Sequence, residues 1–438
     1  MALAMARAIE AHVWKPLIAS WLGWLFDGYE TFALVLVAPI AVRQLISQDQ
    51  LPQAPIYIGG LLAVTLVGWA TGGVAAGILA DYIGRRRMLM LSILFYAAFA
   101  GLSALAPTYA ALLLFRFMTG LGLGAEWGPG AALVAEVWPP PVRGRAAGTL
   151  QSAFGFGSIL ATVIWLVVAP LDPSAWRYMF LLGALPALLL LYIRSSVSEP
   201  AMWVTVDERR HAARQRAASG HAAEPEDEGL VRFTMHYVVS TPELRRRLIL
   251  LLLMSLSSIV GWWAVSSWIP QYGGQILSAT GRDPQQGATI TGLSYYVGGI
   301  AGFWALGALG DTWGRKRTIT CYFLLALVMV WVLFLLVRDP VLFLIATAVN
   351  GFFTVGQFSW MPMYLPELFP TGVRGSAISL VFDITRYVAA LGPLLAGWLI
   401  ASLGGIATAA SIIGVIYLLG LVATPFAGPE TKGTPLPA

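Results

Sequence analysis

The sequence predicts an all-α membrane protein, with twelve transmembrane helices in two pseudo-symmetric six-helix bundles. Hydrophobic residues make up 58% of the 438 residues and charged residues only 11%, whereas about a quarter of a soluble chain is charged. Long apolar runs follow one another along the chain, and each can span the roughly 30 Å hydrocarbon core of a bilayer. Two polar motifs also recur in the second half, which predicts a duplicated architecture.

The first motif joins two apolar runs in each half. Gly77-Ile-Leu-Ala-Asp81-Tyr-Ile-Gly84-Arg85-Arg86-Arg87 recurs 230 residues later as Gly307-Ala-Leu-Gly-Asp311-Thr-Trp-Gly314-Arg315-Lys316-Arg317. The second motif, Glu136-Val-Trp-Pro139 with Arg143, returns 231 residues later as Glu367-Leu-Phe-Pro370 with Arg374. A carboxylate at the end of a span can accept hydrogen bonds from a neighbouring helix N-terminus or pair with Arg85. Such contacts can hold one side of the molecule closed.

The apolar runs give the order of the elements. We expect spans at roughly 17–43, 56–80, 88–106, 109–137, 146–169, 178–193, 248–275, 288–310, 318–337, 340–365, 376–400 and 403–425. Residues 1–194 are then the N-terminal bundle, 195–247 a cytoplasmic linker and 248–438 the C-terminal bundle. The middle of the linker, residues 211–229, lacks apolar periodicity, so we expect it to be partly disordered, with short helices at each end.

The placement of basic residues predicts the orientation. Most of the 27 Lys and Arg residues fall in the termini and in the loops on one side, while the opposite loops hold only Arg43, Arg177, Arg282 and Arg338. The positive-inside rule then predicts a multi-pass protein of the cell inner membrane with both termini in the cytoplasm. The first span follows no cleavage pattern, so we expect it to be retained. The net charge of +5 is thus a topology signal and does not indicate nucleic-acid binding.

Several chemistries are excluded by what the sequence lacks. Cys321 is the single cysteine, and all four histidines lie outside the apolar runs. There is no metal-ligand cluster, nucleophile–base motif or phosphate-binding loop. We therefore expect no enzyme activity, no metal and no cofactor, and a monomer that works in the lipid bilayer. Proton chemistry inside the membrane must use carboxylates.

Four acidic residues inside the spans are the candidates for proton coupling, because a charge in the membrane is costly and is usually paired or functional. Asp27 and Glu30 are three residues apart and share a helix face. Glu126 corresponds to neutral Gln357 at the 231-residue offset, as Asp27 corresponds to Ser258. Asp383 completes the set. The alternatives are that Asp27 bonds to span four or eleven in a purely structural contact and that Glu30 faces an outer vestibule.

The candidates for substrate binding centre on Arg386, whose planar guanidinium suits a carboxylate. Its alternative role is a local ion pair with Asp383. We add Tyr29, Gln357, Trp360 and Arg116, although Arg116 can instead pair with another span. Aromatic residues near these levels either pack between helices or line an apolar pocket around an organic anion: Trp21, Trp24, Tyr29, Trp127, Trp262, Trp263, Tyr295, Tyr296, Phe358 and Trp360.

The repeated motifs resemble the signature loops of the major facilitator superfamily, over nearly the whole chain. The resemblance implies two six-helix bundles that rock around a central cavity to give alternating access. It also implies an inner gate formed by Gly77, Asp81, Gly84, Arg85, Glu136, Arg143, Asp311, Arg315, Glu367 and Arg374.

A narrower resemblance lies in the first half, in Asp27-Gly-Tyr-Glu30, in Arg116-Phe-Met-Thr-Gly-Leu-Gly-Leu-Gly-Ala-Glu126 and in Trp176-Arg-Tyr-Met-Phe. These segments are similar to the proton symporters for sialate and monocarboxylates, and the first also to those for aromatic acids. The expected function is proton-coupled secondary transport of small organic anions, particularly monocarboxylates, driven by the proton gradient. The alternatives are proton-driven efflux of drugs or metabolites and a transporter-like sensor without flux.

Overall fold

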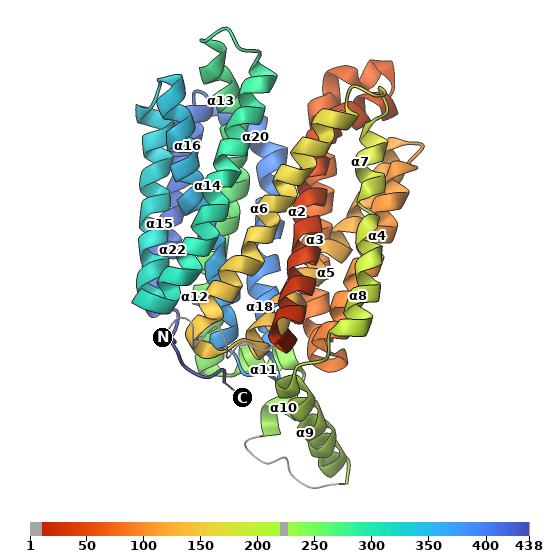
Figure 1. Ribbon diagram of the computed structural model, residues 1–438, viewed down its shortest axis with the longest axis vertical. Coiled ribbons are helices and arrows are strands. Elements are labelled where there is room, and N and C mark those ends of the chain that lie inside the picture. Colours follow the sequence, from red (N-terminus) through yellow and green to blue (C-terminus); the bar gives the residue numbers. More distant parts are fainter. Residues whose placement is uncertain (1–10, 220–226, 438) are drawn as a thin grey trace.

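The computed structural model describes residues 11–219 and 227–437, which form helices and connecting turns without strands. The helices stand side by side in two bundles, with the N-terminal bundle in red to yellow and the C-terminal bundle in green to blue (Figure 1). The six segments of the N-terminal bundle are α2 (Ala11–Leu45), α3 (Ala54–Ile83), α4 (Arg85–Ala104), α5 (Tyr109–Val137), α6 (Arg143–Val168), and α7 (Trp176–Leu182) with η3 (Leu185–Leu188) and α8 (Leu189–Ser196).

The C-terminal bundle has six corresponding segments, several of them interrupted. They are α12 (Pro242–Ala264) with η5 (Ser266–Trp268) and α13 (Ile269–Ser278); α14 (Pro284–Trp313); α15 (Arg315–Trp331) with η6 (Val332–Leu336); α16 (Pro340–Thr354) with η7 (Gly356–Ser359), α17 (Trp360–Tyr364) and η8 (Leu365–Glu367); α18 (Arg374–Asp383) with α19 (Arg386–Ala389) and α20 (Leu391–Ser402); and α21 (Ile406–Ile413) with η9 (Gly414–Ile416), α22 (Tyr417–Ala423) and η10 (Thr424–Phe426).

Twelve helical segments therefore cross the molecule, and the predicted fold class is confirmed. Ten of them, within the described residues, are long and apolar enough to cross a membrane. The other two are α5, which contains Arg116, Glu126 and Glu136, and the segment that turns between α18, α19 and α20. The charges lower the mean hydropathy of α5, and the turns divide the second segment into short helices, of which α18 is buried.

Local chemistry sets the helix ends. Gly84 and Gly314 have φ of 106° and 103°, a conformation that only glycine adopts readily, and each ends one helix and begins the next within a single residue. At the other end of the bundle, Asp283 and Asp339 accept hydrogen bonds from the first backbone N–H groups of α14 and α16. Glycines allow close helix contact: a Cβ on Gly72 of α3 would lie 1.9 Å from the Leu121 carbonyl oxygen of α5.

The segment between the bundles is more helical than the sequence suggested. Helix α9 runs from Ala201 to Ala218, so residues 211–218 form a helix where we expected an irregular chain. Helices α10 (Glu228–Val231) and α11 (Thr234–Ser240) follow, while residues 220–226 lie outside the described residues. The expectation of disorder failed for 211–218 because Ala and Arg favour helix without any apolar stripe. The predicted domain boundaries remain a prediction.

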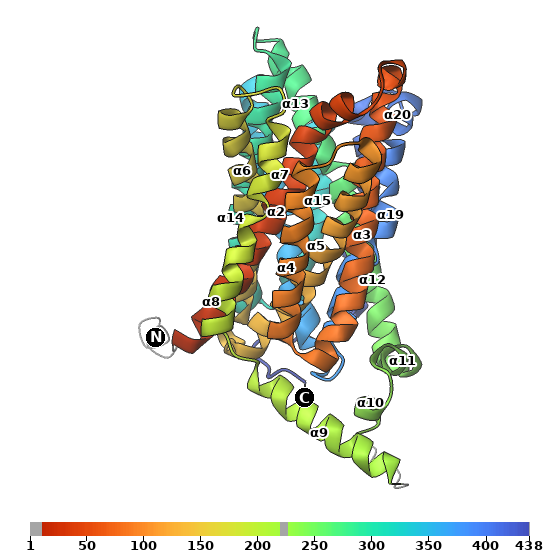
Figure 2. The same ribbon diagram turned by 90° about the vertical axis from the view of Figure 1, so that its right-hand side faces the viewer.

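Helices α9–α11 mark what we call the linker end of the molecule. The start of α2, the Gly84 and Gly314 turns and the C-terminal residues before 438 all lie toward this end (Figures 1 and 2). Figure 2 shows α9 projecting below the bundle, with the transmembrane helices above it. The opposite end carries the loops that follow α2 and α13.

Candidate functional site

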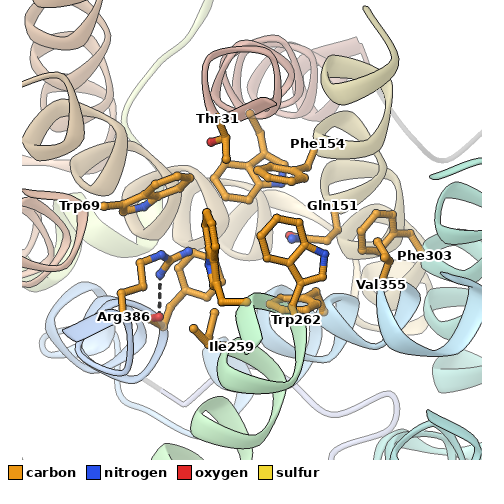
Figure 3. Close-up of a pocket in the computed structure, with 13 residues that line it drawn as sticks. Thr31, Trp69, Gln151, Phe154, Ile259, Trp262, Phe303, Val355 and Arg386 are labelled. Atoms are coloured by element: carbon orange, nitrogen blue, oxygen red, sulfur yellow. Dashed lines mark hydrogen bonds between the residues drawn. The ribbon is translucent and has the colours of Figure 1, made fainter. Parts of the chain in front are cut away.

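A cavity lies between the two bundles. Both bundles contribute to its wall, through α2, α3 and α6 on one side and α12, α14, η7, α18 and α19 on the other. Most of the lining side chains are aromatic: Trp24, Trp69, Phe154, Trp262, Trp263, Phe303, Phe358 and Phe382. Figure 3 shows Trp69, Phe154 and Trp262 arranged around the space, with Arg386 entering from one side.

Arg386 is the charged member of the residues that line the cavity. Its guanidinium donates a hydrogen bond of 2.7 Å to Asp383 Oδ1 and another of 2.7 Å to the Phe382 carbonyl oxygen. It also lies 4.6 Å from the ring centre of Trp69 and 4.0 Å from that of Phe382. Nη1 donates both bonds. Nη2 and Nε donate no hydrogen bond to another described residue. The remaining donors are therefore free for a ligand.

Gln151 and two tryptophans add polar groups to the aromatic wall. The Gln151 carbonyl oxygen accepts a 3.1 Å hydrogen bond from Trp127 Nε1. Because an indole nitrogen can only donate, this bond leaves the Gln151 amide nitrogen as the free group. The buried Nε1 atoms of Trp24 and Trp69 have no hydrogen-bond partner among the described residues. The cavity thus offers one cation, several neutral donors and flat apolar walls.

The backbone of the C-terminal bundle is interrupted at the depth of the cavity. A turn at Ile384–Thr385 separates α18 from α19 and places Asp383 and Arg386 on either side of it. Further breaks fall at Val265, with φ −129° and ψ −62°, and at Val355, which itself lines the cavity. The N-terminal lining helices α2, α3 and α6 have no such break. Irregular backbone inside a membrane is tolerated where it borders a cavity.

Asp27 and Glu126 form a buried acidic pair in the N-terminal bundle. They are 0% and 1% exposed, they interact electrostatically, and none of their four carboxylate oxygens has a hydrogen-bond partner among the described residues. The Tyr96 hydroxyl is close enough to Glu126 to interact with it but lies outside hydrogen-bonding geometry. A small cavity, lined by Ser20 and Trp24 among others, adjoins Glu126.

The corresponding positions in the C-terminal bundle are neutral and satisfied. Ser258, the counterpart of Asp27, donates a 3.4 Å hydrogen bond to Gln357 Oε1, the counterpart of Glu126. Gln357 Nε2 donates to the Thr354 carbonyl oxygen, and Trp360 Nε1 donates to Ser258 Oγ. The two halves therefore hold equivalent positions in different ways, with hydrogen bonds on one side and unpaired acids on the other.

Glu30 and Arg116 form an ion pair next to the aromatic cavity. Two guanidinium nitrogens of Arg116 approach Glu30 Oε2 at 2.9 and 3.0 Å, while Oε1 is buried without a partner among the described residues. Arg116 also stacks on Phe180 at 4.7 Å. The pair borders a small cavity that shares Thr31, Trp69 and Trp263 with the aromatic cavity.

The structure separates the predicted substrate-binding residues. Arg386 lines the aromatic cavity, and so do Trp24, Trp262, Trp263 and Phe358 from the aromatic candidates. Four others do not: Arg116 pairs with Glu30, Tyr29 donates a hydrogen bond to the Met179 carbonyl oxygen, and Gln357 and Trp360 bond to Ser258 within their own bundle. A direct substrate contact for these four has no geometric support here.

At the linker end, two acids bind helix N-termini across the interface between the bundles. Asp81 of α3 accepts hydrogen bonds from the backbone N–H groups of Gly375 at 3.0 Å and Ser376 at 2.8 Å, at the start of α18. Asp311 of α14 accepts equivalent bonds of 2.9 Å from Gly144 and Arg145 at the start of α6. Each acid also pairs with the arginine four residues on.

Two further clusters join the bundles beside these acids. Glu136 lies between Arg85 at 3.2 Å, from its own half, and Arg374 at 2.7 Å, from the other. Glu367 lies between Arg315 at 2.9 Å and Arg143 at 3.1 Å in the same arrangement. We call the eight residues of these contacts the linker-end network: Asp81, Arg85, Glu136, Arg143, Asp311, Arg315, Glu367 and Arg374. Gly77 permits the contact, because a Cβ there would lie 2.6 Å from the Gly375 carbonyl oxygen. The linker end is therefore closed.

Several residues that contact the linker-end network were not predicted from the sequence. Glu199 accepts hydrogen bonds from the backbone of Arg86 and Arg87, and Glu430 does so from Arg315 and Lys316. Their separation of 231 residues was a signal that could have found them. Two other contacts came from segments without a repeat. Arg210 of α9 donates to the carbonyl oxygens of Asp81 and Gly372, one in each half, and burial lowers the pKa of its guanidinium, although Asp81 opposes this effect.

The C-terminal tail also contacts the network. Arg374 donates a 2.8 Å hydrogen bond to the Pro437 carbonyl oxygen, and Arg143 donates one of 3.3 Å to that of Thr434. Both the linker and the tail thus touch both bundles. No group of three or more His, Cys, Asp or Glu side chains suited to a metal ion occurs in the described part of the chain.

Comparison with known proteins gives a consistent picture. Residues 17–438 match the family described as sugar (and other) transporter. A metabolite transport protein of Haemophilus influenzae is 30% identical over 434 residues, which cover 99% of this chain and 100% of that protein. The 4-hydroxybenzoate transporter of Pseudomonas aeruginosa is 25% identical over 412 residues, covering 92% and 88% of the two chains.

Solved structures show the same fold. A proton:xylose symporter of the major facilitator superfamily superposes with a TM-score of 0.73 at 20% sequence identity, over 97% of this chain and 98% of that one. At this identity the comparison supports the arrangement of helices and not the substrate.

Proposed function

Because the chain belongs to the sugar (and other) transporter family of the major facilitator superfamily, we propose that it is a proton-coupled importer of small organic anions. The substrates are monocarboxylates with a flat apolar body, and aromatic acids fit this description. The protein is a multi-pass membrane transporter and not an enzyme. We place it in the inner membrane as a monomer with its linker end in the cytoplasm, as the basic loops favour.

The observation that carries this proposal is a single arginine inside an aromatic cavity. Arg386 lies beside Trp69 and Phe382 and has donors left over after its bond to Asp383. A carboxylate can take those donors in a two-point contact, while an aromatic ring can pack against Trp24, Phe154 and Trp262. A neutral sugar would need many hydrogen-bond partners, which these walls do not offer.

Charge balance supports coupling to a proton. In the empty cavity Asp383 neutralises Arg386, so an incoming carboxylate adds a negative charge to a region with the unpaired acids Asp27 and Glu126. A buried net charge in a membrane costs several kcal/mol. Uptake of one proton by Asp383, Asp27, Glu126 or Glu30 would remove that charge and let the loaded protein change conformation. The relative of P. aeruginosa named for 4-hydroxybenzoate transport gives independent support for an aromatic acid.

The closed linker end supports a mechanism of alternating access. To release substrate into the cytoplasm, the bundles must part there, and the linker-end network must lose its contacts across the interface. These contacts are buried and charged, so their loss must be offset by new contacts on the opposite side. The network therefore sets the balance between two states of the transporter.

The test is uptake of labelled 4-hydroxybenzoate into proteoliposomes with an imposed pH gradient. An acidic exterior should drive accumulation, benzamide should not compete, and benzoate should. Arg386→Lys should weaken the competition by benzoate about 10- to 100-fold, because hydrogen bonds to charged groups contribute roughly 1.5–3 kcal/mol. The control is Arg338→Lys, at an exposed arginine outside the cavity. Accumulation that does not depend on the pH gradient would contradict proton coupling. Accumulation only when the interior is the more acidic side would mean that substrate exchanges for protons, and would assign the protein to proton-driven efflux.

A further inference from the structure

A cationic groove opens on the C-terminal bundle at the linker end, away from the linker-end network's interface. Its lining includes Trp313 at the end of α14, Lys316, Arg317 and Cys321 on α15, and Lys432 in the C-terminal tail. Trp313 is 58% exposed, and Arg317, Cys321 and Lys432 are exposed as well. Three positive charges and an open tryptophan thus meet where two membrane-spanning helices end.

The donors of this groove are available. Lys432 Nζ spends one of its three N–H groups on the Thr312 carbonyl oxygen. The side chains of Lys316 and Arg317 make no hydrogen bond or ion pair to another residue of the described ranges. Glu430 is bonded to the backbone N–H groups of Arg315, Lys316 and Lys432 rather than to their side chains. The charges therefore face outward without an acidic partner.

The equivalent place on the N-terminal bundle is covered. Tyr82 corresponds to Thr312 at the 230-residue offset, and it lies beneath the guanidinium groups of Arg210 and Arg214 from α9, at 4.9 and 5.3 Å. Its hydroxyl also accepts a hydrogen bond from the Thr234 backbone. The linker thus fills this place in one half, whereas in the other half the groove is open.

The surface next to the groove continues as an apolar stripe. Arg317, Cys321, Leu324 and Val328 follow one another at spacings of four, three and four residues, so they share one face of α15. All four are exposed. Val422 and Phe426 expose further apolar surface beside Pro425, which also lines the groove. A ligand in the groove therefore meets cations at its polar end and lipid-facing side chains along the rest.

We propose that this groove binds the phosphate headgroup of an anionic phospholipid from the cytoplasmic leaflet, with the acyl chains along the α15 stripe. The chemistry required is a phosphate beside Lys316, Arg317 and Lys432, with Trp313 at the level of the headgroups. A free phosphate compound satisfies the cations but leaves the apolar stripe unused. The lipid satisfies both, and it is present wherever the protein is.

The natural chain supplies its own reporter, because Cys321 is its single cysteine and lies in the groove. The experiment measures the rate at which N-ethylmaleimide, an uncharged reagent, modifies Cys321 in nanodiscs. Phosphatidylcholine discs are compared with discs that also contain phosphatidylglycerol and with phosphatidylcholine discs plus glycerol phosphate. The bound headgroup should slow modification several-fold in the phosphatidylglycerol discs only. Native mass spectrometry should retain phosphatidylglycerol on the same protein.

The variant Lys316→Gln/Arg317→Gln tests the site against a general surface effect. Each cation near an anionic lipid surface strengthens binding about fivefold, so two should account for about 25-fold. The double variant should lose the protection and the retained lipid. The control is Arg245→Gln/Arg246→Gln, which removes two exposed charges from the start of α12 and should keep both. If the double variant cannot be purified, Lys432→Gln allows the same two measurements, with a smaller expected loss of protection and of retained lipid.

Three results would overturn the proposal. Equal protection in wild type and in Lys316→Gln/Arg317→Gln would assign the effect to the charge of the membrane surface. Protection by glycerol phosphate in pure phosphatidylcholine would place a soluble phosphate compound in the groove. Full protection in phosphatidylcholine alone, relieved by neutralising Glu224 and Glu226 of the linker, would assign the groove to these two acidic residues.

Discussion

Asp311 in the C-terminal bundle accepts a hydrogen bond of 2.9 Å from the backbone N–H of Gly144 in the N-terminal bundle. Asp81 in the N-terminal bundle accepts the equivalent bond from the backbone N–H of Gly375 in the C-terminal bundle. Each bundle thus supplies the anion that stabilises a helix N-terminus of the other. The two bonds are related by the internal duplication, so closure of the linker end depends on both halves equally.

Replacing Asp311 by Asn should shift the transporter toward the state that is open at the linker end. The variant loses an anionic acceptor and the ion pair with Arg315, which together should cost about 2 kcal/mol, or ~30-fold in the closed-to-open ratio. Spin-label distances across the linker end measure that ratio. The control Asp283→Asn also neutralises an acid at a helix N-terminus, but that helix, α14, begins at the next residue, so the ratio should be unchanged. Equal shifts in both variants would contradict the role of Asp311.

Gly307→Ala should have a similar effect through packing alone. A Cβ at Gly307 would lie 2.3 Å from the Gly144 carbonyl oxygen of the other bundle, so the closed interface must move apart. Overpacking of this kind costs about 1–3 kcal/mol. Gly292→Ala, on the same helix, meets its nearest atom at 3.8 Å and is the matched control. The same distance measurement checks both, and an unchanged interface in Gly307→Ala would exclude tight packing there.

Asp383→Asn should make the empty protein less stable and the liganded protein comparatively more stable. The change leaves the buried Arg386 without its 2.7 Å ion pair, a loss that typically costs about 3–5 kcal/mol. A substrate carboxylate can replace that partner, so benzoate should raise the melting temperature more in the variant than in wild type. Asp339→Asn, a helix cap outside the cavity, should not respond in this way. A smaller benzoate effect in Asp383→Asn would mean that the carboxylate does not reach Arg386.

Asp27→Asn with Glu126→Gln should remove proton coupling without unfolding the protein. Neither acid has a hydrogen-bond partner in the described chain, so their neutralisation breaks no ion pair and reproduces the neutral arrangement at Ser258 and Gln357. We expect substrate exchange to continue while accumulation driven by a pH gradient falls. Exchange and driven uptake, measured in the same proteoliposomes, separate the two effects.

Glu30→Gln is the informative contrast to that double variant. Glu30 accepts both hydrogen bonds of Arg116, so its neutralisation leaves a buried cation and should lower stability by about 3–5 kcal/mol. A melting temperature that drops in Glu30→Gln but not in Asp27→Asn/Glu126→Gln would match the structure. The reverse order would contradict the absence of bonding partners for Asp27 and Glu126 among the described residues.

The sequence predicted the fold and the linker-end network well, because both depend on patterns that repeat. Apolar runs of membrane length define the helices, and the Asp81 and Asp311 motifs recur at one offset. The sequence left open whether such an acid meets a helix N-terminus or its own arginine, and the structure shows both contacts in both halves.

The cavity was less predictable. Membrane helices are apolar on all sides, so periodicity does not show which aromatic side chains face inward. Trp69, Phe154 and Phe382 line the cavity without any sequence signal that distinguishes them, while Trp360 and Tyr29 pack inside their own bundles. Arg386 was found because a charge within a span is costly and conspicuous. The sequence did not predict the break in the helix between Asp383 and Arg386.

The most direct test of proton-coupled carboxylate transport is the pH inside proteoliposomes when substrate is added outside. With a pH dye trapped in the lumen and no imposed gradient, 4-hydroxybenzoate should acidify the interior of wild-type vesicles. Vesicles with Arg386→Ala should show only the slow leak of the neutral acid. Acidification at the same rate in wild type, Arg386→Ala and protein-free vesicles, while wild type still takes up labelled substrate, would contradict the account.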